Sequence, residues 1–148
     1  MKRNVANLNP ISWVSTVYFA MGLPMVMLSD VSLLLFKDMG IPDKRITFWA
    51  SLLILPWSLK PFFSPLMELF GSKRQYVFIS EIISALMLGL IAASLGLEES
   101  FPLLLVLMAV MALSGSVHDI AGDGIYMEAL TPTLQSKFVG WQGAFYNI

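Results

Sequence analysis

The sequence contains no cysteine, a single histidine and few charged residues, which make up 13% of its 148 positions. Without cysteine it forms no disulfide framework, no thiolate metal site and no cysteine nucleophile. The net charge is −1 and no long basic run is present, so nucleic-acid binding is excluded as a class. One histidine leaves too few ligands for a metal hydrolase. The sequence therefore predicts no enzyme, no cofactor and no metal site.

Apolar residues are abundant instead, at 57% of the chain, and the mean hydropathy is +0.74. A soluble domain of this length needs far more polar surface. About 20 residues, each rising roughly 1.5 Å, cross a hydrocarbon core of about 30 Å. Four segments are long enough, at approximately residues 11–36, 46–69, 76–97 and 101–130. We therefore predict an all-α fold: a polytopic helix bundle with four transmembrane helices, surrounded by a lipid bilayer.

A fifth apolar segment begins at Phe138 and extends only to Ile148. It is too short to cross a bilayer, so the sequence predicts four spans and the start of a fifth. We expect the 148 residues to be the N-terminal part of a longer protein, and we expect them to transport nothing by themselves.

Proline and glycine inside the spans predict bends, because proline removes a helix hydrogen bond. The first span carries Gly22 and Pro24, and the second carries Pro56, Pro61 and Pro65. Bends serve a gated cavity in some membrane proteins and are ordinary membrane-helix composition in others. Both interpretations stay open. The first span lacks a small-residue cleavage pattern, so we predict that it is kept as a span and not removed as a signal.

Lysine and arginine in short loops predict the orientation, because they concentrate on the cytoplasmic side. With the N-terminus inside, the cytoplasmic side collects Lys2, Arg3, Lys73, Arg74 and Lys137. The outer side then collects Lys37, Lys44 and Arg45, together with the acidic Glu98 and Glu99. We predict a multi-pass protein with a cytoplasmic N-terminus.

Four ionisable residues lie inside the second and fourth spans: Lys60, His118, Asp119 and Asp123. A charge at that depth costs about 2.5 to 3.5 kcal/mol on insertion scales, so it is normally kept for a task. We predict that Lys60 pairs with Asp119 or Asp123, because an unpaired lysine is costlier. The carboxylates either lock the two helices together or carry protons. His118 points to another face of the fourth span. We interpret it as a contact between helices in preference to a proton carrier.

Small and polar residues recur at helical spacing along one stripe of the fourth span. The stripe comprises Ala112, Gly115, Ser116, Asp119, Asp123 and Tyr126. It must face the bundle or a wet cavity, which makes Ser116 and Tyr126 candidate substrate contacts. Asp30, in the outer half of the first span, contacts substrate or protons or lies at the wet mouth of the cavity. Glu81 is shallow enough to reach headgroups or Arg74.

The loop after the second span, residues 64–74, resembles the signature loop of the major facilitator superfamily. Its acid, its glycine and its basic pair are Glu68, Gly71, Lys73 and Arg74. In such a tight cytoplasmic turn the acid faces a helix N-terminus and the bases anchor at the membrane interface. This loop departs from the pattern at Ser64, in place of the leading glycine, and at Leu69, in place of a base.

Three further segments, residues 18–24, 55–66 and 118–124, together resemble the AmpG-type muropeptide permeases and their acetyl-CoA transporter relatives in that superfamily. The resemblance implies part of an N-terminal six-helix half. It also implies proton-coupled import of a muropeptide across a bacterial inner membrane by alternating access. By position, Lys60, Asp119 and Asp123 match the charged motif residues. Met21 and Asp30 depart from the pattern, which weakens the substrate assignment. The alternative is a small multispan signalling or assembly protein without a translocation path.

Overall fold

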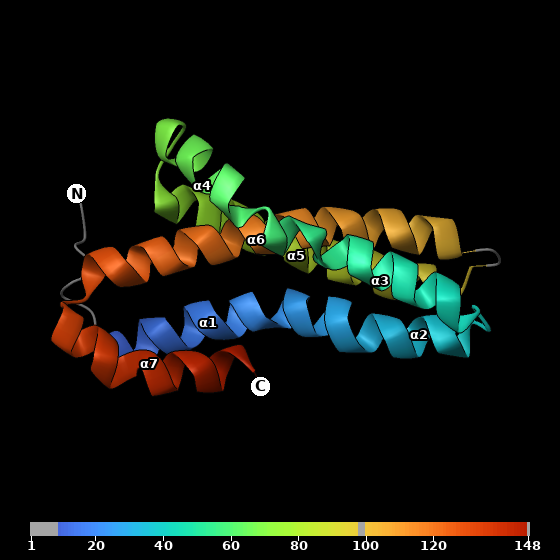
Figure 1. Ribbon diagram of the computed structural model, residues 1–148, viewed down its shortest axis with the longest axis horizontal. Helices are drawn as coiled ribbons and strands as arrows, with labels where there is room; N and C mark the ends of the chain where they lie inside the picture. Colours follow the sequence, from blue (N-terminus) through green and yellow to red (C-terminus); the bar gives the residue numbers. More distant parts are fainter. Residues whose placement is uncertain (1–8, 98–99, 148) are drawn as a thin grey trace.

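The computed structural model describes residues 9–97 and 100–147, and these form a bundle of helices with no strand among them (Figure 1). Three of the helices are long and apolar enough to cross a membrane, and a bent pair forms a fourth candidate span. The prediction of an all-α polytopic membrane bundle is confirmed. Residues Lys2, Arg3, Glu98 and Glu99, which entered the orientation prediction, lie outside the described residues.

The first span runs from Pro10 to Asp38 as α1 (Pro10–Val26), the π-helical η2 (Met27–Val31) and α2 (Ser32–Asp38). At its start, the Asn9 side chain accepts a 3.1 Å hydrogen bond from the Ile11 amide, and Pro10 occupies the first turn, where it removes no hydrogen bond. The π-helical turn begins at Met27, three residues after Pro24. A proline inside a helix frees a carbonyl, and π-helical turns are one way in which a span absorbs this. The expected distortion is therefore present.

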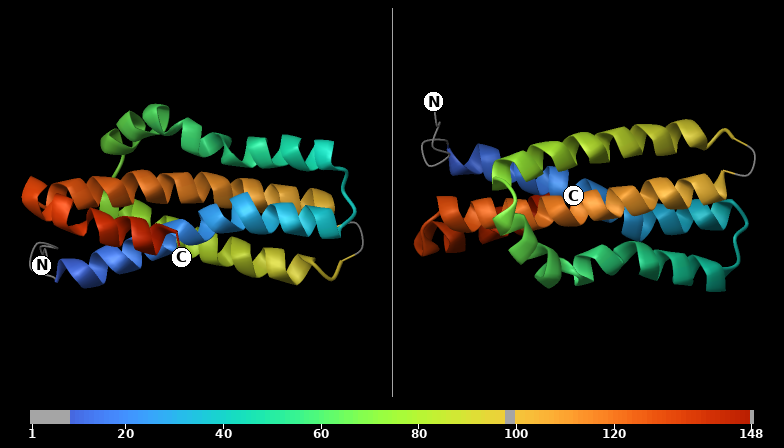
Figure 2. Two further views of the ribbon diagram at one scale, coloured as in Figure 1. Left: turned by 60° about the horizontal axis from the view of Figure 1, so that its bottom comes forward. Right: turned by 90° about the horizontal axis from the view of Figure 1, so that it is seen from above.

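The second span consists of α3 (Asp43–Ser58) and α4 (Lys60–Leu69), which meet at Leu59 with a bend of 43°. Pro61 lies in the first turn of α4 and has no amide hydrogen to continue the helix across the break. Beyond the bend α4 diverges from the other helices (Figures 1 and 2) and has no buried residue. The predicted proline bend is confirmed and sets the direction of Lys60.

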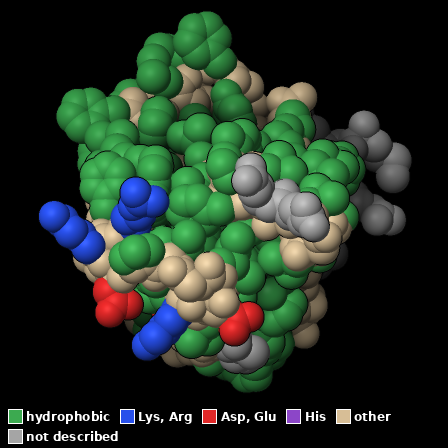
Figure 3. Space-filling view, turned by 90° about the vertical axis from the view of Figure 1, so that its right-hand side faces the viewer, with side chains coloured by type: hydrophobic (Ala, Val, Ile, Leu, Met, Phe, Trp, Pro, Cys, Tyr) green, Lys and Arg blue, Asp and Glu red, His purple; other side chains and the backbone are tan. Residues whose placement is uncertain are grey.

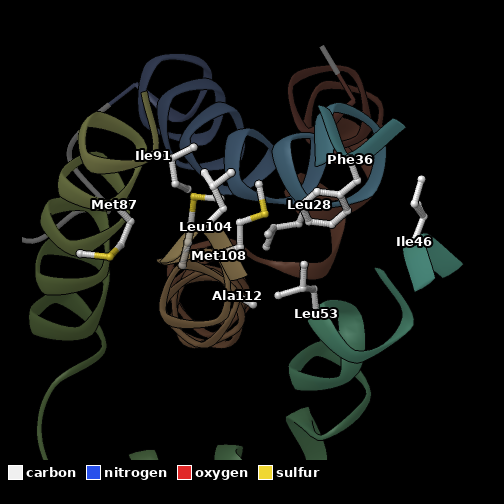
Figure 4. Close-up of a cluster of buried hydrophobic side chains, with 10 residues drawn as sticks. Leu28, Phe36, Ile46, Leu53, Met87, Ile91, Leu104, Met108 and Ala112 are labelled. Carbon is white, nitrogen blue, oxygen red and sulfur yellow. The ribbon is translucent and has the colours of Figure 1, made fainter. Parts of the chain in front are cut away.

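The two following spans, α5 (Lys73–Ser94) and α6 (Phe101–Ala129), pack along much of their length. Helix α6 is the centre of the bundle, because α1, α3, α4 and α5 all contact it. Around α6 lies the larger hydrophobic core (Figure 4), which comprises Leu28, Phe36, Ile46, Leu53, Met87, Ile91, Leu104, Met108, Met111 and Ala112. Polar groups on different sides of α6 therefore meet different helices.

The fifth helix, α7 (Pro132–Tyr146), begins six residues earlier than the predicted Phe138. The correction follows from the turn chemistry: Pro132 starts the helix, and Gln135 Nε2 donates to the Leu130 carbonyl at 2.8 Å. The first turns of α7 are polar, so hydrophobicity alone did not predict that the helix begins before Phe138. Helix α7 returns along α1, as Figure 1 shows, and packs on it through a second core cluster: Val14, Tyr18, Met21, Tyr126, Leu130 and Phe138.

Charged side chains gather at the two ends of the bundle, while many large apolar side chains are exposed along it. One end carries Lys73, Arg74, Glu128 and Lys137. The opposite end, which faces the viewer in Figure 3, carries Lys37, Asp38, Asp43, Lys44 and Arg45. This distribution suits a helix bundle whose apolar flank lies in lipid. Which end is cytoplasmic stays a prediction.

Candidate functional site

Lys60 and Asp119 form an ion pair between α4 and α6. Lys60 is the first residue of α4, so the break at Leu59 directs the start of this helix, and with it the ammonium group, towards α6. The two partners differ in accessibility: the Lys60 side chain is 32% exposed and the Asp119 side chain 4%. Of the two predicted partners for Lys60, the structure selects Asp119.

Asp123 lies one turn further along α6 and is held by α1. The Tyr18 hydroxyl donates a 2.7 Å hydrogen bond to Asp123 Oδ1. Tyr18 is 1% exposed, and its ring meets the Tyr126 ring edge-on at 5.7 Å between centroids. Tyr18 was not predicted as a partner of Asp123, although it is the first residue of segment 18–24, which carries part of the resemblance. A tyrosine in an apolar span needs a hydrogen-bond partner, and that was the available signal.

These groups surround one cavity of about 390 Å³. Its lining from α1, α4 and α6 comprises Tyr18, Met21, Lys60, Asp119 and Asp123, and its lining from α7 comprises Val139, Gln142, Gly143 and Tyr146. The α7 contribution was missed because this segment was interpreted as an unfinished span. The helical spacing of these four α7 residues was the signal that identifies a common face. The cavity holds one cationic side chain and two carboxylates.

Glycine lets the helices approach closely around this cavity. A Cβ on Gly122 of α6 would lie 2.5 Å from Met21 Cε of α1. At Gly115 a Cβ would lie 3.0 Å from the Trp57 ring and 3.1 Å from Pro24 Cβ, so both bent spans touch α6 there. Small residues at such crossings permit tight packing of membrane helices.

The stripe of α6 predicted to face inward does so. Asp123 is half-buried, and the five buried members are Ala112, Gly115, Ser116, Asp119 and Tyr126. Two substrate-contact candidates on it lie outside the cavity lining. The Ser116 hydroxyl donates to the Leu113 carbonyl at 2.9 Å, and the Tyr126 hydroxyl donates to the Gln135 carbonyl at 2.7 Å. Asp30 is exposed within η2 and also lies outside the cavity lining.

His118 faces α5 and not the cavity. Its Nε2 lies 3.3 Å from Glu81 Oε1 and its side chain is 3% exposed. Next to this contact, the Ser114 hydroxyl donates to the Ser80 carbonyl at 2.8 Å. The interpretation of His118 as a helix contact agrees with this geometry. Glu81 was expected to reach headgroups or Arg74, and its contact with His118 was not predicted. Residue spacing within one helix does not show which residues of two different helices face each other.

The loop that resembles the superfamily signature forms a tight turn between α4 and the first residue of α5. Gly71 has φ +125°, a backbone conformation that favours glycine. Ser72 then caps α5, and its amide donates to Gln75 Oε1 at 3.1 Å in a capping box. The Tyr76 hydroxyl closes the turn by donating to the Phe70 carbonyl.

The charged residues of this loop have partners that were not predicted from the sequence. Lys73, for which anchoring at the membrane interface stays a prediction, pairs with Glu128 at the end of α6. Its aliphatic stem crosses Gly124, where a Cβ would lie 2.8 Å from Lys73 Cε. Glu68 and Arg74 line a second cavity of about 820 Å³ beside this pair.

Among the described residues, no group of three or more histidine or acidic side chains is placed to hold a metal ion. A model of the BT1 family matches residues 21–144, which include every cavity residue except Tyr18 and Tyr146. No curated protein matches the chain, and no solved structure does.

Proposed function

Because this chain belongs to the BT1 family, a family of the major facilitator class of membrane transporters, we propose that it takes part in proton-coupled solute import by alternating access. The observation that carries the proposal is the cavity where Lys60, Asp119 and Asp123 converge. Ionisable groups inside membrane spans are expensive and mark substrate or proton paths. Here they come from two spans, and a third supplies the hydroxyl of Tyr18.

The three charged residues have different roles in this proposal. Asp119 and Asp123 are the proton-coupling candidates, and Lys60 is the gate that joins the bent α4 to α6. Because Lys60 follows the break at Leu59 directly, opening of its ion pair frees the start of α4 to move. His118 is a weaker coupling candidate, because it contacts Glu81 of α5 and does not line the cavity. Glu68, Gly71, Lys73 and Arg74 form the cytoplasmic turn, and Asp30 lies at the mouth of the path.

The finer assignments rest on the resemblance of residues 18–24, 55–66 and 118–124 to AmpG-type permeases. We propose that the 148 residues form part of an N-terminal six-helix half, with the N-terminus in the cytoplasm of a bacterial cell. On this proposal the membrane is the inner membrane and the solute is a muropeptide. Membership of a transporter family disfavours the alternative of a signalling or assembly protein without its own path.

Uptake into proteoliposomes tests the proposal. The protein, as its gene encodes it, is reconstituted and given a labelled anhydro-muropeptide with an inward proton gradient. We expect uptake that follows the gradient, stops with a protonophore and falls in Asp123→Asn, while membrane insertion is unchanged. Asp43→Asn is the matched control, because Asp43 is exposed at the opposite end of the bundle. Uptake of a different solute alone would refute the muropeptide assignment, and absence of any proton-driven uptake would refute the coupling.

A further inference from the structure

We propose that Gln142 of α7 determines part of the solute specificity: its side-chain amide binds an uncharged amide group of the solute, such as the acetamido group of a sugar. This inference rests on the proposed function. It concerns a neutral part of the solute, to which the roles of Lys60, Asp119 and Asp123 do not apply. It starts from a polar side chain that lines the cavity without a hydrogen-bond partner.

Gln142 is the polar exception in an apolar stretch of α7. Between Phe138 and Phe145 it has the one side chain that carries both hydrogen-bond donors and an acceptor. It lines the cavity, yet its amide has no hydrogen-bond partner within residues 9–97 and 100–147. An amide withdrawn from water without a partner is costly. Gln142 therefore needs a partner that enters the cavity.

The charged groups and the α1 hydroxyl of the cavity contact each other. Lys60 pairs with Asp119, and the Tyr18 hydroxyl donates to Asp123. Gln142 lines the cavity from α7, and its amide neither gains nor loses a proton at physiological pH. Its contribution is therefore to the selection of the solute and not to proton coupling.

Close packing of α7 on α1 fixes the position of Gln142 (Figure 1). A Cβ on Gly22 of α1 would collide with the Tyr146 carbonyl, so the two backbones touch there. Gln142 lies four residues before Tyr146 and therefore on the same face of α7. Next to it, a Cβ on Gly143 would meet no atom within 4 Å, so the cavity wall is open at this place. A packed helix thus presents the amide to open space.

An amide is the neutral group that best matches the glutamine side chain, because both have a carbonyl acceptor and an N–H donor in one plane. Without solute, water is the partner available to Gln142. Displacing such a water costs affinity unless the incoming group reproduces its hydrogen bonds, which an amide does and a hydrocarbon group does not. The sugars of the proposed solute carry acetamido groups. The cavity volume of about 390 Å³ equals roughly 13 water molecules at about 30 Å³ each, which leaves room for such a group.

A cycle of two proteins and two solutes tests this contact. Proteoliposomes of the protein as its gene encodes it take up a labelled anhydro-muropeptide or an analogue whose acetamido groups are replaced by hydrogen. The uptake rate at low solute concentration is measured for the wild type and for Gln142→Met, which keeps the length of the side chain and removes its amide. The preference for the acetamido compound should be about tenfold larger in the wild type than in Gln142→Met, which is within the range of one hydrogen bond.

Trp141→Phe is the matched control, because Trp141 precedes Gln142 on α7, is 45% exposed and lies outside the cavity lining. This variant should keep the wild-type preference. If Gln142→Met does not insert, Gln142→Asn replaces it. Asparagine keeps an amide on the helix but withdraws it from the cavity by one methylene group, so the preference should again be lost.

An equal preference in the wild type and the Gln142 variant overturns the inference, even if the variant takes up both compounds more slowly, because a contact between helices alone affects both alike. The same loss of preference in Trp141→Phe also overturns it. Both results leave the proposed transport function intact. A wild type that takes up neither compound overturns the proposed function and the inference with it.

Discussion

Removal of the Lys60 ammonium group should destabilise the bundle through Asp119. Truncating one member of a buried pair costs about 3 to 5 kcal/mol, because the remaining charge is uncompensated. The Lys60 side chain is 32% exposed, so water already screens part of the interaction and reduces the cost to the lower end of that range or slightly below it. We expect Lys60→Met to cost about 2 to 3 kcal/mol. Lys60→Met with Asp119→Leu should recover most of that loss, because it leaves no charge unpaired.

Reversible unfolding of the purified protein by denaturant in mixed micelles measures these free energies. The single changes and the double change form a thermodynamic cycle, which isolates the interaction between the two side chains. Lys137→Met is a matched control, because Lys137 lies on α7 outside the cavity lining. If the interaction free energy is below about 0.5 kcal/mol, within the additivity expected of independent sites, the ion pair does not hold α4 to α6. The lock and the proton site would then both lose their physical basis.

Further substitutions test the other contacts, each by the free energy of unfolding in the same micelles. Tyr18→Phe removes the donor to Asp123 and should cost about 1.5 to 3 kcal/mol, whereas an unchanged stability would show that this hydrogen bond does not form. Gly115→Ala places a methyl group against Trp57 and Pro24 and should cost about 1 to 3 kcal/mol, while Gly89→Ala, with open space around it, should cost nothing similar. Equal effects at the two glycines would contradict the close crossing. Gly71→Ala forces a side chain into a positive-φ conformation and should reduce the free energy of unfolding by about 1 to 3 kcal/mol. Gly96→Ala is the control and should have a smaller effect, because a Cβ there meets no atom within 4 Å.

The charged residues of α6 contact three different helices. His118 contacts α5, Asp119 pairs with α4 and Asp123 is bound by α1. Successive positions of a helix differ by about 100°, so neighbours in sequence reach different sides of the bundle. The lock and the coupling interpretations of the two aspartates therefore do not exclude each other, because a contact that holds two helices in one state can release them in another.

The pairing of Lys60 was predictable to within two candidates. Depth along an apolar span follows from residue number, so the sequence placed Lys60 about as deep as Asp123, with Asp119 one helical turn away. The choice between the two acids needed the 43° break at Leu59, which sets the direction of the lysine side chain. Tyr18 was missed for a similar reason, since its partner lies 105 residues away in the chain.

The start of the fifth helix shows a second limit. Hydrophobicity identified the apolar residues from Phe138 onward, but the polar turns from Pro132 to Lys137 are helical as well. Their place is fixed by contacts with α6, such as the Tyr126 hydroxyl on the Gln135 carbonyl. Until α7 is placed in this way, one wall of the cavity is missing. The size and lining of the cavity could therefore not be predicted from the sequence.

The sequence by itself determined the membrane setting, the approximate spans, the proline bends and the set of buried charges, because hydropathy, proline geometry and the cost of charge in lipid act locally along the chain. Only the tertiary structure decided which charge meets which partner and where a cavity remains. Those outcomes depend on the rotation and crossing of helices, which glycine contacts such as Gly115 against Trp57 and Pro24 set across the bundle.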